Sequence, residues 1–245
     1  MGFVRMKRLG IALALIAGAV VFYVTAYPSL TLRYRLTLEA QVGDEPRIGS
    51  GVIEVTYSKV VRVWATTDLS IDVRGEAVVL DLGSRGMLFA LLAADTDSRS
   101  IPESIILRAY NFDGGAFPGP SVEEGQKQLR RLSGKRELPL DSLPMLVRFR
   151  DLNDAMTVER VSPLNIGERF GADAKLVRAT LEIVPAGVWP LNAFGITGQP
   201  TTTGIERKLP WWNGPFPWEK PMGNGVFIDT RMEAIKANKI EFKRG

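Results

Sequence analysis

The chain of 245 residues contains no histidine and no cysteine. These absences exclude zinc sites built on imidazole or thiolate ligands, cysteine nucleophiles, serine–histidine–aspartate triads and disulfide bonds. The missing cysteine also excludes a lipid-modified N-terminal cysteine. A domain without disulfides is stabilised by burial alone, and a hydrophobic content of 45% over this length is sufficient for that.

Several catalytic and binding motifs are also missing. The sequence has no phosphate-binding P-loop, no Ser-x-x-Lys pair and no G-x-S-x-G nucleophile elbow. Carboxylates therefore remain as the acid–base groups of ordinary pKa, and they cluster at 95–97 and 151–154. Neither cluster continues as a calcium loop, so solvated turns and helix caps are the favoured interpretation. We predict no catalytic residue, no cofactor and no metal site.

The formal net charge is +4, and Arg5, Lys7 and Arg8 supply three of these charges. The rest of the chain is close to neutral, so its charge does not indicate nucleic-acid binding.

An uncharged run follows this basic leader, from Leu9 to Tyr27. Its length is about what a helix needs to cross roughly 30 Å of hydrocarbon, so we predict a transmembrane anchor that contacts the lipid bilayer through these residues. The leader charge favours a cytoplasmic N-terminus. The alternative is a signal peptide that is cleaved after Ala26 and releases a soluble periplasmic domain.

Beyond Pro28 the pattern changes to strict alternation, in which the even positions of 32–42 are mostly apolar and the odd positions polar. This period is typical of a half-buried strand. Similar patterns predict further strands, with Ser58–Lys59 as a tight connection and Arg74–Gly75 as a hairpin corner. The predicted strand segments are 51–57, 60–65, 71–73, 77–82, 145–150 and 175–184, while 87–94 fits a strand or a helix. In the segment 175–184 the alternation places Val177 on the apolar face.

One helix is predicted to begin at Ser121, because Ser121 and Glu124 have the spacing of a capping box. Lys127, Arg131 and Lys135 follow at intervals of four residues and would form one basic stripe. This stripe is a candidate contact for anionic lipid head groups or an acidic partner. The alternative is an ordinary solvent-exposed face, because acidic residues flank it.

The segment 189–245 is rich in glycine, proline and tryptophan. Aromatic side chains in such an arm could stack on sugar rings, lie in a membrane interface or anchor a protein partner, and the candidate contacts are Trp212, Phe216 and Trp218. The alternative is that the aromatic residues cover an open face of a sheet. A short helix is predicted over 229–238, at the end of the arm.

The predicted fold is mainly β: a single N-terminal transmembrane helix, then an antiparallel, sandwich-like β domain with one or two helices and the C-terminal arm. Residues 1–27 form the leader and anchor, 28–188 the β-rich exported domain, and 189–245 the arm, packed on the same domain.

Several segments resemble an uncharacterised family of bacterial membrane-anchored proteins, which has no assigned activity. The resemblance implies a bacterial envelope protein, with the anchor in the inner membrane and the C-terminal domain in the periplasm. It implies no functional residue. The similar segments are 34–39, 51–55, 75–83, 88–92, 146–151, 157–161 and 203–211.

Two functions from different classes fit the sequence. The first is a non-enzymatic envelope protein, an accessory subunit or binding module whose partner is another envelope protein or a glycan. The second is a carboxylate-dependent hydrolase of an envelope polysaccharide, which requires two carboxyl groups about 5–10 Å apart in a tryptophan-lined cleft.

Overall fold

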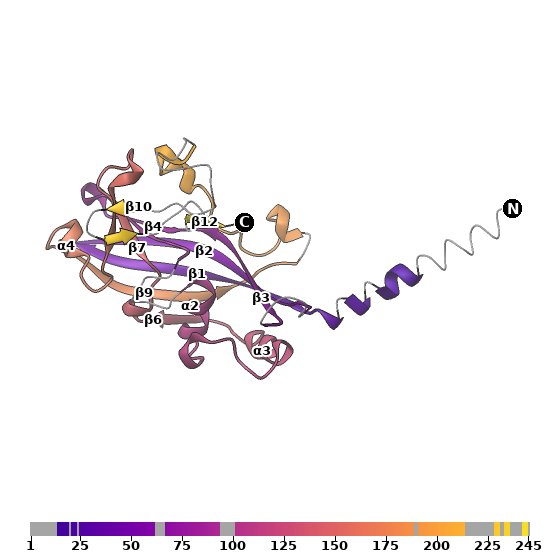
Figure 1. Ribbon diagram of the computed structural model, residues 1–245. Helices are drawn as coiled ribbons and strands as arrows, with labels where there is room; N and C mark the ends of the chain where they lie inside the picture. The colour runs from indigo at the N-terminus through magenta and orange to yellow at the C-terminus, as the bar shows by residue number, and fades with distance from the viewer. Residues whose placement is uncertain are drawn as a thin grey trace.

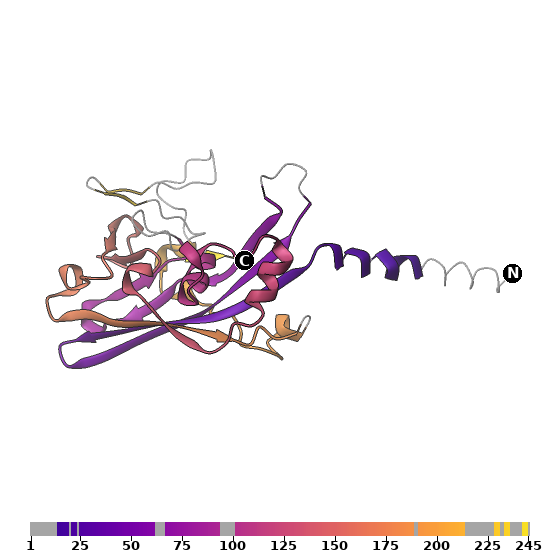
Figure 2. The same cartoon turned by 90° about the horizontal axis from the view of Figure 1, so that it is seen from below.

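The computed structural model describes residues 14–19, 21–23, 25–61, 67–93, 101–188, 191–213, 228–230, 233–235 and 242–244. The protein is mainly β, as predicted, with two antiparallel sheets that share one hydrophobic core (Figures 1 and 2). The N-terminal helical residues project away from one end of this β domain. We call this end the proximal end, and the end with the β1–β2 turn the distal end.

The larger sheet is built around β1 (Ser29–Val42), which is hydrogen-bonded on both sides. Its strand order is β12-β3-β2-β1-β9-β6. The other strands are β2 (Glu45–Lys59), β3 (Leu69–Glu76), β6 (Lys135–Leu138), β9 (Ala174–Val184) and β12 (Lys243–Arg244).

The smaller sheet is buried on both faces. Its order is β4-β5-β7-β8, with bounds Val78–Asp81, Met87–Ala90, Leu146–Phe149 and Val158–Val161. One face packs on the distal half of the larger sheet, where β4 comes so close that a Cβ on Gly49 would lie 2.3 Å from the carbonyl oxygen of Val79. The other face contacts the segment that contains Trp211 and Trp212. A separate hairpin pairs β10 (Ile228–Thr230) with β11 (Glu233–Ile235).

Helix α2 (Pro102–Ala109), which the sequence analysis did not predict, packs on the proximal half of the larger sheet. The hydroxyl groups of two buried tyrosines hold it there: Tyr34 donates to the carbonyl of Pro102 and Tyr57 to the carbonyl of Glu103. Burial raises the pKa of both tyrosines well above the usual value for a phenol. The remaining helices are short: α3 (Val122–Leu129), α4 (Gly167–Phe170) and the 3-10 turns at 83–85, 113–115, 140–142, 155–157, 191–194, 205–207 and 210–213.

Three local predictions are wrong. Ser58–Lys59 continues β2, and Arg74–Gly75 continues β3, because the pairing of these two strands runs from Glu54–Arg74 to Lys59–Leu69. Within the predicted C-terminal helix 229–238, the described residues lie in β10 and β11, so that region forms a hairpin.

The alternation predicted for β9 is interrupted. Glu39 pairs with Arg178, and the next residue Ala40 pairs with Leu176, so Val177 is an extra residue in the strand. Such a bulge reverses which side chains face the core. Leu176 is therefore buried, whereas Val177 lies on the opposite face and is 55% exposed.

Of the N-terminal run, residues 14–19, 21–23 and 25–26 are helical. Among the residues that the structure describes, no helix combines the length and the apolar character that a membrane span requires.

The bulge leads to a stability prediction. Replacing Leu176 with Asn removes buried apolar surface and buries an amide without a partner, so it is expected to cost about 3 kcal/mol or more. Val177→Asn at the exposed neighbour should stay within about 0.5 kcal/mol. Chemical denaturation of both variants measures the difference. A larger loss at Val177 would mean that the strand alternates without the bulge.

Candidate functional site

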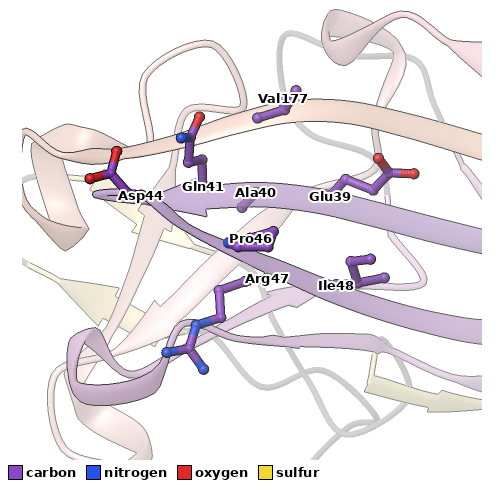
Figure 3. A pocket seen from close by; sticks show the side chains of 8 residues that line it. All are labelled: Glu39, Ala40, Gln41, Asp44, Pro46, Arg47, Ile48 and Val177. Atoms are coloured by element: carbon purple, nitrogen blue, oxygen red, sulfur yellow. The ribbon is translucent and has the colours of Figure 1, made fainter.

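A pocket of about 340 Å³ lies at the distal end of the larger sheet, on the face opposite the core. The end of β1, the start of β2 and the bulge of β9 form it, and Figure 3 shows the side chains. The bulge contributes directly, because it turns Val177 toward this face. The lining residues are Glu39, Ala40, Gln41, Asp44, Pro46, Arg47, Ile48 and Val177.

The two carboxylates of the pocket are separated. Glu39 and Asp44 lie at opposite ends, with Ala40 and Pro46 between them (Figure 3). The carboxylate of Glu39 accepts hydrogen bonds of 2.7 and 2.9 Å from Arg178 Nη2, and this hydrogen bonding raises the pKa of Arg178. The pocket therefore places separate polar groups beside two exposed aliphatic side chains, Ile48 and Val177.

The acidic cluster at 151–154 forms turns, as predicted. The carboxylate of Asp151 accepts from the backbone N–H of Asn153, and that of Asp154 from the N–H of Met156. Both carboxylates thus satisfy local backbone groups. Asp95 and Asp97 lie outside the described residues. No group of three potential metal ligands occurs within the described part of the chain.

Three aromatic residues of the arm, Trp211, Trp212 and Phe242, pack on the outer face of the smaller sheet. Trp212, one of the candidate contact residues, is buried there, and the neighbouring Trp211 packs against it. The centre of the Trp211 ring also lies 5.4 Å from the centre of the Phe149 ring and 6.0 Å from the centre of the Phe242 ring. The cause is the apolar outer face of the smaller sheet, which would otherwise be exposed to water. The other two candidate contacts, Phe216 and Trp218, lie outside the described residues.

The predicted helix is capped as expected, because the Ser121 hydroxyl accepts a hydrogen bond from the N–H of Glu124. The basic stripe is shorter than predicted. Lys127 and Arg131 are exposed at and just beyond the end of α3, but Lys135 lies in β6. The helix ends at Leu129, so the spacing of four residues no longer places Lys135 on its surface.

Sequence reasoning missed the buried charges. Glu76, only 2% exposed, accepts from the N–H of Ile205 and forms an ion pair with Lys243, which also bonds Glu206. This cluster attaches β12 and the turn before the tryptophans to the end of β3. The signal in the sequence is an acidic residue directly before the apolar run 77–80, and it does not identify a partner more than 120 positions away.

A second buried ion pair crosses the larger sheet on its outer face, where Arg33 Nε lies 2.7 Å from a carboxylate oxygen of Glu54. Arg33 also donates to the carbonyl of Gln199, and Arg35 to the side chain of Gln199. These contacts hold the segment that follows β9 against the sheet.

Comparison with known proteins found no matching family model, no similar curated protein and no similar solved structure. The resemblance to a family of membrane-anchored proteins therefore depends on the sequence segments alone.

The position of Trp212 generates a prediction about the arm. Trp212→Ala should lower the free energy of unfolding by about 3–5 kcal/mol, because it leaves a cavity against the smaller sheet. Trp218→Ala should leave the melting temperature nearly unchanged, because charged residues follow Trp218 in the sequence. Thermal unfolding of the two variants tests this. Equal, large losses of stability in both variants would mean that Trp218, like Trp212, is buried and stabilises the fold.

Proposed function

We propose that this chain is a single-pass protein of the bacterial inner membrane, with a short cytoplasmic N-terminus and a periplasmic β domain. In this proposal the β domain is a non-enzymatic accessory subunit or binding module. The membrane holds it at the proximal end, and its distal pocket faces away from the bilayer.

The observation that carries the proposal is the exposure of the N-terminal helical residues. Leu15, Ile16, Val21, Phe22 and Tyr23 are between 60% and 70% exposed, and the helix projects from the domain without packing on it (Figure 1). Exposed apolar side chains gathered in this way are costly in water and are typical of a membrane or protein contact. Residues 9–27 supply the uncharged length for a span.

The junction between this helix and the β domain supports the same arrangement. The carbonyl oxygen of Pro28 accepts hydrogen bonds from the N–H of Lys59 (3.0 Å) and from the side-chain amide of Gln126 (3.0 Å). Gln126 also donates to the carbonyl of Tyr57, so α3 is fixed beside the chain where it enters the domain. An anchor that ends at Tyr27 would therefore hold α3 close to the lipid head groups.

The two exposed cations Lys127 and Arg131 are then candidates for contact with lipid phosphates. The Nζ atom of Lys127 lies 3.8 Å from Oε2 of Glu124, and an exposed ion pair at this distance is weak. Glu123 forms its ion pair with Lys59. Arg131 has no ion pair among the described residues, so of these two cations it is the more available for contact with a phosphate.

The distal pocket is the candidate for ligand contact. It lies at the far end of β1, 14 residues from the junction, and it combines exposed Ile48 and Val177 with Gln41, Asp44 and Arg47. Aliphatic groups beside a few polar ones suit another envelope protein or a glycan.

The anchor is tested by extraction and topology. The chain should stay in the membrane fraction through a carbonate wash, because a buried uncharged helix is not released by breaking ionic contacts. A reporter fused after Gly245 should be active only outside the cytoplasm. Release of the protein by carbonate, or reporter activity in the cytoplasm, would contradict the proposal.

A further inference from the structure

The strand topology brings a second apolar segment to the proximal end. β9 ends at Val184, which is next to Arg33 near the start of β1, and the chain then continues in the direction of Pro28. Both views place the turn at 191–194 at the end of the domain from which the N-terminal helix emerges (Figures 1 and 2). We call residues 185–199 the proximal loop.

The proximal loop is closed at its base. The N–H of Gln199 donates to the carbonyl of Pro185 (2.9 Å), and the two legs of the loop touch at Gly187 and Gly198. A Cβ on Gly187 would lie 2.4 Å from the carbonyl oxygen of Thr197, so the legs meet with no room for a side chain. The bonds from Arg33 and Arg35 to Gln199 fix this base on the larger sheet.

Three described side chains near the tip of the loop are aliphatic and exposed. Val188, Leu191 and Ile196 are 66%, 43% and 68% exposed, and the sequence contains no charged residue between Glu182 and Glu206. The tip also satisfies part of its own backbone, because the N–H of Asn192 donates to Val188 and that of Ile196 to Leu191. Internal hydrogen bonding lowers the cost of leaving water.

We propose that the proximal loop inserts these three aliphatic side chains into the interface of the same bilayer that holds the anchor. The inference rests on the proposed function, because the anchor brings the bilayer to the proximal end. A lipid surface is the occupant that the observations favour. The loop lies at the same end of the domain as the anchor junction, it contains no charged residue, and its base is hydrogen-bonded to the larger sheet. The β domain then has two contacts with the membrane, which fix its orientation.

The absence of cysteine in the chain allows a direct test, since one introduced cysteine gives one labelled position. The full chain is reconstituted in lipid nanodiscs that contain a doxyl-labelled phosphatidylcholine, with an environment-sensitive fluorophore at Ile196→Cys. The matched control is Ile48→Cys, the same residue type at 69% exposure in the distal pocket. Val21→Cys reports on the anchor.

The doxyl lipid should remove most of the fluorescence at positions 196 and 21 and leave position 48 almost unchanged. Loss at position 21 with equal, weak quenching at 196 and 48 would overturn the loop insertion and leave the anchor intact. A label at 196 that is shielded from aqueous iodide but is not quenched by the doxyl lipid would also overturn it, because the loop would then contact protein. No quenching at position 21 would contradict the anchor itself, and the loop insertion with it.

Discussion

The position of β1 determines the rest of the structure. This strand is hydrogen-bonded along its length to β2 and over ten residues to β9, and its even-numbered side chains form the centre of the core. A strand with both edges paired and one face buried cannot shift by one residue without exposing its whole apolar set.

The two faces of the larger sheet have different roles. On the inner face, α2 packs on one half of the larger sheet and the smaller sheet on the other half. Gly49 and Gly51 of β2 have no side chain, so β4 can approach closely. On the outer face, ion pairs cross neighbouring strands: Glu54 pairs with Arg33, Glu182 with Arg35 and Glu39 with Arg178. These pairs keep most of the outer face polar, so the exposed aliphatic groups of the sheet and its loops concentrate near its two ends.

Some of this could be predicted from the sequence, where the signal is local. The alternation of β1 and the cap at Ser121 depend on neighbouring residues, and both were predicted correctly. The bulge at Val177 could not be predicted, because only the pairing with β1 reveals the extra residue. The burial of Trp212 likewise depends on the smaller sheet, which is distant in sequence. The distal pocket and the proximal loop arise from strand ends that meet through pairing, so neither has a local motif.

The proposed anchor requires that the β domain stays attached to its N-terminal helix. Intact-mass measurement of the protein purified from membranes tests this most directly. The expected result is a species that retains residues 9–27, to which residues 1–245 contribute 27.0 kDa, and that requires detergent for solubility. A soluble species whose chain begins at Tyr27 would contradict it, and would establish that the leader is a cleaved signal peptide.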